Sequence, residues 1–509
     1  MKRFTLWALL GICLTGAFFR VHDIRNTPPG LYPDEAMNGN NALEAIATGS
    51  YKIFYPENNG REGLFINIQA LFLNALGRRE AWVLRLPSAL FGILTIAGVY
   101  FLARELFSQA VGLLAAFFLA VAHWHVIFSR IGLRVITAPF FIVWGLVFLL
   151  MGFRKLRLTR SFSRSRAYFL VAGLFYGLGF HGYIAYRSTP FILLAVLLYF
   201  MYRFRKSGLS REFRLGAATF VVTTIVVVIP LVLYFAAHPD SFFGRVSGLS
   251  VFNSDAPVKN LLSNAVKTAG MLNWRGDLNW RHNVSGKPEL FWPIGILFWA
   301  GVLLGLSSIA KRFARNRAAS RMAFVLTRQS FAYVMLFIWI ITAVVPVILS
   351  NERLPHALRS LLLVPPVMIL AAVATVRAAG IVERRVGKQL TAIVMAAFIL
   401  YALVDGYHTC FIQWAKDPHL SAFFGADYVR IGKEINALPD ETQKFVVVEA
   451  RGMTVHGVPM PAQTIMFLTN TYSGENRERK NLSYISSREA KEVPPGSYTW
   501  TLKDIPSEP

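Results

Sequence analysis

REAWVLRLPSALFGILTIAGVYFLARELF, residues 79–107, contains an apolar run near 84–103. A helix of about 20 residues crosses the hydrocarbon core of a bilayer, so this run is long enough to span a membrane. Ten further runs of the same character lie near 4–20, 109–127, 135–153, 167–184, 189–202, 215–236, 291–310, 331–349, 361–376 and 390–405. The chain is therefore predicted to be a polytopic α-helical membrane protein with about 11 transmembrane helices.

The composition and the placement of charge support this fold class. Of the 509 residues, 54% are hydrophobic and only 16% are charged, although the net charge is +25. The connections on one side of the predicted spans hold 24 Lys and Arg against three acidic residues; they are residues 2–3, 104–105, 154–166, 203–214, 311–330 and 377–388. By the positive-inside rule that side is cytoplasmic. The basic charge is thus a topology signal and does not indicate nucleic-acid binding.

This topology predicts a protein of the cell (cytoplasmic) membrane with its N-terminus in the cytoplasm. The run near 4–20 lacks a clear small-x-small cleavage site, so we interpret it as a retained span. Residues 1–405 are predicted to form the transmembrane domain, with a first outer loop at about 21–83 and a large outer loop at about 237–290. A helical pattern in 427–438 and a strand pattern in 444–450 predict that residues 406–509 form a small extracytoplasmic α/β domain.

The first outer loop contains two amphipathic helices in this prediction. Residues 28–44, PPGLYPDEAMNGNNALE, begin with turn-forming residues and continue with helical spacing, and Asp34 and Glu35 stand where the helix starts. The second helix follows in REGLFINIQALFLNALG, residues 61–77. We expect both helices to lie along the membrane surface with their polar groups outward.

Local sequence leaves two interpretations of the acidic residues open. In one, Asp34 is a helix N-cap, and Glu35 and Glu62 are first-turn acids that complement a helix dipole. In the other, these carboxylates belong to a catalytic site beside the bilayer. Arginines recur on the same outer side, although span-end arginines also commonly extend to lipid headgroups. The outer arginines considered as donor-binding candidates are Arg61, Arg85, Arg130, Arg134, Arg187 and Arg353.

Glycosyl transfer from a lipid-linked donor suits a carboxylate beside the bilayer with cations around it. The carboxylate deprotonates an acceptor hydroxyl, the oxygen attacks the anomeric carbon of the sugar, and a phosphate leaves. Arginines or a divalent metal ion then neutralise the charge that develops on the phosphate. Asp34 and Glu35 are the catalytic candidates for this chemistry.

Three motifs resemble the GT-C superfamily, within the branch of the protein O-mannosyltransferases and the lipid A aminoarabinose transferase. They are Tyr32-Pro33-Asp34-Glu35, Arg61-Glu62-Gly63-Leu64 and Arg85-Leu86-Pro87-Ser88. The resemblance implies an inverting transferase that uses a polyprenyl-phosphate sugar, with Asp34 as the base. It also implies that Glu62 and Arg85 help to hold metal, donor phosphate or acceptor, so that Asp34 and Glu62 are candidate ligands for Mg or Mn. Gly63 departs from the Lys-Pro that follows the second acid in the aminoarabinose transferases.

We therefore predict a hexosyl or pentosyl transferase of the cell envelope that acts on the extracytoplasmic face. Its expected partners are a polyprenyl-phosphate-linked sugar, membrane lipids, and a lipid, glycan or protein acceptor, so that both protein glycosylation and lipid modification remain open. The alternative is a multi-pass transporter or flippase of lipid-linked or glycan substrates. Transporters place polar groups near the membrane midplane in broken, repeated helices, whereas the charges here lie in the outer loops.

Overall fold

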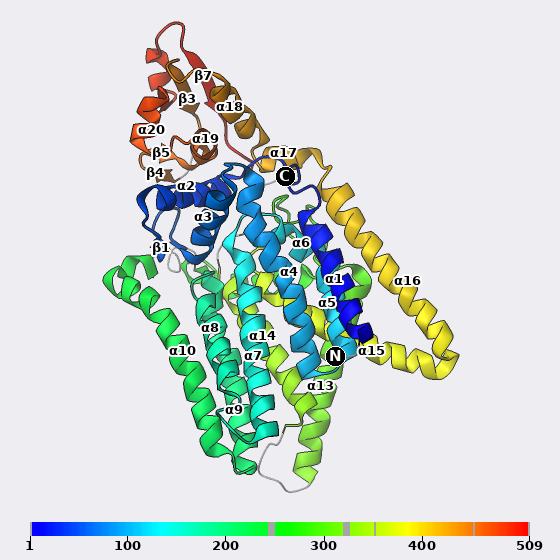
Figure 1. Cartoon of the computed structure of the whole chain (residues 1–509). Coiled ribbons are helices and arrows are strands. Elements are labelled where there is room, and N and C mark those ends of the chain that lie inside the picture. Colours follow the sequence, from blue (N-terminus) through cyan, green and yellow to red (C-terminus); the bar gives the residue numbers. More distant parts are fainter. Residues whose placement is uncertain (1–2, 243–249, 319–325, 351–352, 451–452, 507–509) are drawn as a thin grey trace.

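The computed structural model describes residues 3–242, 250–318, 326–350, 353–450 and 453–506. Residues 243–249 of the expected large outer loop lie outside these ranges. The structure is a long helical bundle with a smaller region of mixed helices and strands at one end (Figure 1). The polytopic helical fold expected from the sequence is confirmed, with small sheets in the C-terminal region.

Within the described residues, nine helical segments are long and apolar enough to cross a membrane. A tenth is the bent pair α5 (Gln109–Val121) and α6 (His123–Ser129), whose axes differ by 60°. The helices that carry the nine segments are α1 (Arg3–Val21), α4 (Ala81–Leu106), α7 (Thr137–Thr159), α9 (Pro190–Lys206), α10 (Ser210–Ala237), α13 (Trp292–Ala318), α14 (Arg328–Ile348), α15 (Val364–Val386) and α16 (Lys388–Tyr407).

The expected span near 167–184 has a different form in the structure. Its helix α8 (Arg166–Gly179) has 14 residues, a length of about 21 Å at 1.5 Å per residue, and it packs between α7 and α10 (Figure 1). A Cβ on Gly179 would lie 2.1 Å from the ring of Tyr186, so this glycine lets the following segment, η2 (Ile184–Ser188), fold back against the helix end. Apolar composition alone does not reveal this turn.

The first outer loop forms α2 (Pro33–Thr48), the two-stranded hairpin β1 (Phe54–Tyr55) and β2 (Arg61–Glu62), and α3 (Leu64–Leu76). The expectation that α2 presents its polar groups outward is wrong. Asn38, Asn40 and Asn41 are buried, and Asn40 donates to the carbonyl and side-chain oxygens of Gln463 at 3.1 and 2.8 Å. The C-terminal region covers this face of α2 (Figure 1).

The C-terminal region contains the predicted helix and strand, as α18 (Ala426–Ala437) and β3 (Lys444–Val448). β3 pairs in parallel with β6 (Leu482–Ile485) on one side and with β7 (Tyr498–Leu502) on the other, so the strand order of this sheet is β6-β3-β7. The remaining described α-helices and β-strands are α12 (Pro257–Gly270), α17 (Pro418–Phe423), β4 (Thr454–Val455), β5 (Val458–Pro459), α19 (Gln463–Thr469) and α20 (Gly474–Arg479). Apolar side chains of α18 and α19 pack on β3, with Ile431, Ile465 and Val446 in one buried cluster.

The turn before α2 contacts the C-terminal region through Gly30. This residue has φ +77°, and a Cβ there would lie 2.5 Å from the carbonyl oxygen of Phe424 and 2.7 Å from the backbone nitrogen of Ala426. Backbone atoms on both sides leave no flexible side chain that can move aside. The two segments therefore approach each other as closely as a glycine permits.

We expect Gly30→Ala to lower the thermal unfolding midpoint of the detergent-purified protein more than Gly49→Ala does. Gly49 has φ +68° and nothing within 4 Å of its Cβ position, so its substitution adds only the left-handed strain of about 1–2 kcal/mol. Gly30→Ala adds a steric clash of about 1–3 kcal/mol to the same strain. Equal midpoints for the two variants would contradict the close contact.

Candidate active site in the first outer loop

A buried ion pair fixes the start of α2 against α4. The side chains of Glu35 and Arg85 are both 0% exposed, and Arg85 Nε lies 3.0 Å from Glu35 Oε1. Arg85 also donates to the carbonyl oxygens of Pro28 at 2.6 Å and Gly30 at 2.8 Å, and Glu35 Oε1 accepts from the Gly132 N–H at 2.7 Å. Both charges are thus engaged by the protein itself.

Asp34 has a different environment from its neighbour. It is the second residue of α2 and follows Pro33, with Tyr32 as the N-cap, so the N-cap interpretation of Asp34 is wrong. Its side chain is half-buried, and Oδ1 accepts a hydrogen bond from Asn58 Nδ2 at 2.8 Å. Asn58 belongs to the turn between β1 and β2, so this turn orients the carboxylate.

Glu62 is held between two arginines from different parts of the bundle. It lies in β2, before α3, and is not a first-turn acid of that helix. Arg134 Nε donates to Oε2 at 3.1 Å and Arg187 Nη2 donates to Oε1 at 3.3 Å. Arg134 also donates to the carbonyl oxygen of Gly60 at 3.4 Å. Gly60 follows Asn58 by two residues in the same turn. This cluster and Asp34 therefore share the β1–β2 hairpin as support.

Arg61 points from the same hairpin toward α2. Its guanidinium donates to the side-chain oxygens of Asn38, at 2.6 Å, and of Asn41, and its Nε donates to the carbonyl of Glu57 at 3.3 Å. Burial lowers the pKa of Arg61 to about 10, and the nearby Arg134 contributes to the shift. Arg61 therefore remains charged at neutral pH and ties the hairpin to α2.

The other two predicted donor-binding arginines lie elsewhere. Arg130 is buried and donates to three carbonyls, of Phe19, His22 and Thr27, at 2.8 to 2.9 Å. Arg353 is exposed in the segment that leads to η4 (Leu361–Leu363). The structure thus groups Arg61, Arg134 and Arg187 around the hairpin and uses Arg85 and Arg130 to fasten chain segments.

A cavity of about 450 Å³ adjoins this cluster through Arg187, which lines it. Its lining is largely apolar and comes mainly from η2 and the end of α14 with the residues that follow it, including Ile184, Val345 and Leu349; Ser350 and Arg359 also line it. The guanidinium of Arg187 also lies over the rings of Phe235 and Phe242, at 4.9 and 4.6 Å. Arg187 therefore places a guanidinium in the lining of a largely apolar cavity.

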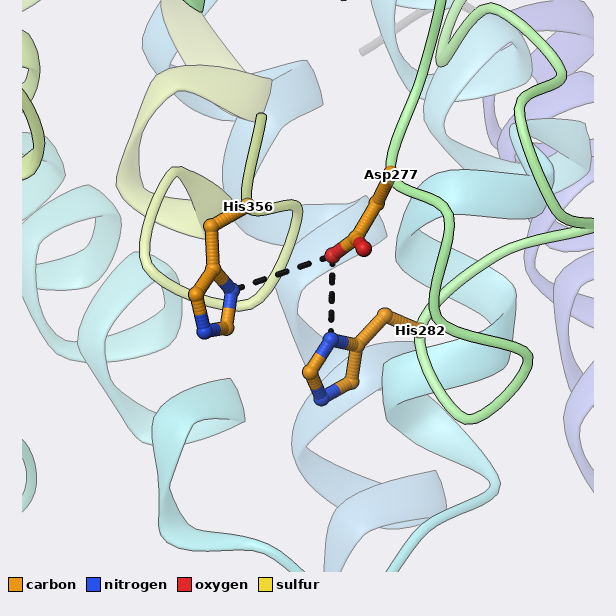
Figure 2. Close-up of side chains that lie close together, drawn as sticks. All are labelled: Asp277, His282 and His356. Carbon is orange, nitrogen blue, oxygen red and sulfur yellow. Dashed lines mark hydrogen bonds and ion pairs between the residues drawn. The ribbon is translucent and has the colours of Figure 1, made fainter. Parts of the chain in front are cut away.

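A second polar cluster in the outer loops has the composition of a metal site. Asp277, His282 and His356 place one ligand atom each within 4.8 Å of one another, and they are the only group of three or more such side chains found among the described residues (Figure 2). The predicted Mg or Mn ligands Asp34 and Glu62 fit a metal less well, because both oxygens of Glu62 accept from arginines and Asp34 accepts from Asn58.

Several residues at these sites were not predicted from the sequence. Asn58 carried only a turn signal, and Asn38 and Asn41 were assigned to an outward polar face. Asp277 had no signal except its position five residues before His282 in GDLNWRH. The partner His356 is remote in sequence, so only the folded chain brings it to Asp277.

We expect Glu35→Gln to reduce the yield of monodisperse protein on size-exclusion chromatography and to lower its unfolding midpoint. The substitution leaves the buried charge of Arg85 without its counter-charge, which costs about 3–5 kcal/mol. Arg78→Gln is the control, because its ion pair with Glu80 is 61% and 48% exposed and contributes at most about 1 kcal/mol. A Glu35→Gln protein that is as stable as this control would contradict the structural role.

Comparison with known proteins supports the fold and gives a family match for one segment of the chain. The profile of the family described as dolichyl-phosphate-mannose-protein mannosyltransferase matches residues 64–238. A search of curated protein sequences finds no match. Among solved structures, ArnT from Cupriavidus metallidurans bound to undecaprenyl phosphate is 16% identical with a TM-score of 0.57, over 97% of this chain and 91% of that one.

The archaeal oligosaccharyltransferase AglB from Archaeoglobus fulgidus has the same fold. Its complex with an inhibitory peptide and a dolichol-phosphate is 16% identical with a TM-score of 0.53, over 96% of this chain and 70% of that one. Its apo form is 14% identical with a TM-score of 0.54, over 92% of this chain, which spans 64% of the length of that enzyme. The chain therefore matches the dolichyl-phosphate-mannose-protein mannosyltransferase family over residues 64–238 and shares the fold of ArnT and AglB.

Proposed function

We propose that this protein is an inverting glycosyltransferase that moves a sugar from a polyprenyl-phosphate carrier to a hydroxyl acceptor on the extracytoplasmic face of the cell membrane. In this proposal residues 1–405 form the transmembrane unit and residues 406–509 the outer α/β unit. The observation that carries it is the single hairpin that supports both the Asp34 carboxylate and the arginine cluster beside an apolar cavity.

Asp34 acts as the general base in this mechanism. Its carboxylate takes the proton of the acceptor hydroxyl while the hydroxyl oxygen forms a bond to the anomeric carbon. The bond from that carbon to the phosphate oxygen breaks, and the phosphate leaves with the electron pair. Attack from the side opposite the leaving phosphate inverts the configuration. Glu35 touches neither reactant, because its carboxylate is buried against Arg85, and it acts as a positioning residue for the start of α2.

Arg187 provides the contact to the phosphate of the donor. It lines the apolar cavity on one side and contacts Glu62 on the other, so an isoprenoid chain in the cavity would bring its phosphate to this guanidinium. Arg134, on the other oxygen of Glu62, adds a second positive charge near the same point. Charge-assisted contacts of this kind stabilise the negative charge that develops on the leaving phosphate.

A metal ion at Asp34 and Glu62 is not needed in this mechanism. The two arginines on Glu62 supply the positive charge that Mg or Mn would provide, and they occupy the oxygens through which Glu62 would bind the ion. Arg61, Arg85, Arg130 and Arg353 are candidates from the sequence for donor binding. The contacts of Arg61, Arg85 and Arg130 favour structural roles for these three.

The structures of similar fold agree with a lipid-linked donor. ArnT was solved with undecaprenyl phosphate and AglB with a dolichol-phosphate and an inhibitory peptide. We propose that this chain uses a carrier of the same chemical class, with a hexose or pentose as the sugar. Envelope lipids, glycans and protein hydroxyls are the acceptor classes compatible with this site.

We expect Asp34→Asn to lower the rate of sugar transfer by about 10²–10⁴-fold without loss of folded protein, because the amide cannot accept the proton. The measurement compares envelope glycoconjugates by mass spectrometry in cells that express the wild-type protein or the variant at equal levels. Glu44→Gln is the matched control, because it removes a carboxylate from the same helix at its partly exposed pair with Lys52. Normal transfer by Asp34→Asn would refute the assignment of the base.

Activity in detergent separates the transferase from a transporter or flippase. Transfer of sugar by the purified protein, with no sealed membrane present, requires chemistry and not translocation. A protein that moves lipid-linked sugars only across liposome bilayers, and never releases polyprenyl phosphate in detergent, would favour the transporter.

We expect Arg187→Gln to raise the KM for the donor lipid, and the inhibition constant of free polyprenyl phosphate, by about 10–100-fold, since a hydrogen bond to a charged group contributes about 1.5–3 kcal/mol. Arg25→Gln is the control, because this arginine lies over the ring of Trp82 on the outer side and outside the proposed cavity. A changed kcat with an unchanged inhibition constant would show that Arg187 does not bind the phosphate.

A further inference from the structure

We infer that Asp277, His282 and His356 bind a divalent transition-metal ion, for which Zn²⁺ is the best match, and that this ion joins two outer loops. The site is separate from the proposed transfer mechanism and does not depend on it. Its three residues lie on two segments that are far apart in sequence, one between α12 and α13 and the other between α14 and η4.

The three side chains point toward one another (Figure 2). The Nδ1 atoms of His282 and His356 lie 3.0 and 3.8 Å from the same oxygen, Oδ2 of Asp277, and all three ligand atoms lie within 4.8 Å of one another. Ligands in a tetrahedral zinc site with bonds of about 2.0–2.1 Å stand about 3.4 Å apart. Shifts on the order of 1 Å therefore suffice to place an ion between these atoms.

The surrounding chain holds this carboxylate in place. Asp277 Oδ2 accepts from the Ala357 N–H at 2.8 Å, and Oδ1 accepts from the Asn279 N–H at 2.9 Å. The rings of His282 and His356 stack with centroids 5.0 Å apart, and Asp277 is 5% exposed. The ligands are thus oriented before any ion binds, which reduces the entropy that ion binding must overcome.

The ligand set determines the class of ion. Two imidazole nitrogens and one carboxylate oxygen are the ligands of three-residue zinc sites, in which water takes the fourth position. Mg²⁺ and Ca²⁺ require mostly oxygen ligands, so two imidazoles disfavour them. On binding, the ion takes the place of the hydrogen between His282 Nδ1 and Asp277 Oδ2, and the neutral imidazole keeps its proton on Nε2.

A hydrogen-bonded Asp–His pair explains only part of the arrangement. Asp417 and His419 form such a pair at 2.8 Å on the outer side, where His419 is 60% exposed. At Asp277 a second imidazole approaches the same oxygen from another loop, at 3.8 Å, beyond hydrogen-bonding distance. Convergence of two imidazoles on one buried carboxylate is the feature that distinguishes this cluster from the pair at Asp417.

An ion here would also hold the loop that reaches the start of α2. The guanidinium of Arg281, next to His282, lies 4.1 Å from the ring centroid of Tyr32, two residues before Asp34. Trp280 in the same loop accepts a hydrogen bond at its carbonyl from the indole of Trp414 at 2.8 Å. The metal site therefore stabilises the outer ends of several spans together.

The test uses the full-length protein, purified in detergent without a histidine tag and stripped with a chelator. Titration with Zn²⁺ is expected to show one ion per chain by elemental analysis and to raise the unfolding midpoint. Asp277→Asn keeps an oxygen that accepts from the Ala357 N–H but removes the charge, and His356→Gln removes one nitrogen ligand. Each variant is expected to bind Zn²⁺ at least about 100-fold more weakly.

His419→Gln is the matched control and is expected to bind Zn²⁺ as the wild-type protein does. X-ray absorption at the zinc edge of the wild-type protein is expected to show two histidine ligands, and this measurement holds even if a variant fails to fold. The inference would be overturned if the protein took up less than one zinc ion per chain. It would also be overturned if the bound ion lacked two histidine ligands. Unchanged affinity in both folded variants would overturn it as well.

Discussion

The buried ion pair of Glu35 and Arg85 is the contact on which the outer part of the molecule depends. Two charges removed from water cost free energy unless each is fully hydrogen-bonded, and here the partners are backbone groups from two separate turns. Pro28 and Gly30 lie in the connection between α1 and α2, and Gly132 lies in the loop before α7. One pair therefore sets the position of the first residues of α2, and Asp34 is among them.

The charged residues of the outer loops divide into two groups by burial. Arg85 and Arg130 are completely buried and bind carbonyl groups of the chain, so their charges hold turns that have no regular secondary structure. Arg134 and Arg187 are partly exposed and share one carboxylate, and Arg187 also lines an apolar cavity. Of these four arginines, only Arg187 lines the cavity.

The C-terminal region and the late loops complete the surroundings of the hairpin. Gln463 of α19 accepts from Asn40, and Gly30 lies against the backbone of Phe424 and Ala426. The loop after α12 adds Arg281 over Tyr32. Segments more than 200 residues apart therefore cover α2 and the turn before it, although the composition of α2 is that of a surface helix.

The amino-acid sequence by itself determined the helical membrane fold, because apolar runs of bilayer length and the one-sided distribution of Lys and Arg act locally along the chain. Short motifs also predicted a site at Asp34, Glu35 and Glu62, and these residues lie in α2 and β2. Tertiary structure alone decided which charges are buried. Arg85 and Arg187 are both arginines on the same predicted side of the membrane, yet Arg85 is buried against Glu35 whereas Arg187 is partly exposed beside Glu62. It alone brought His356 to Asp277 and Asn58 to Asp34, since these contacts join segments whose separation in the sequence carries no signal of their approach.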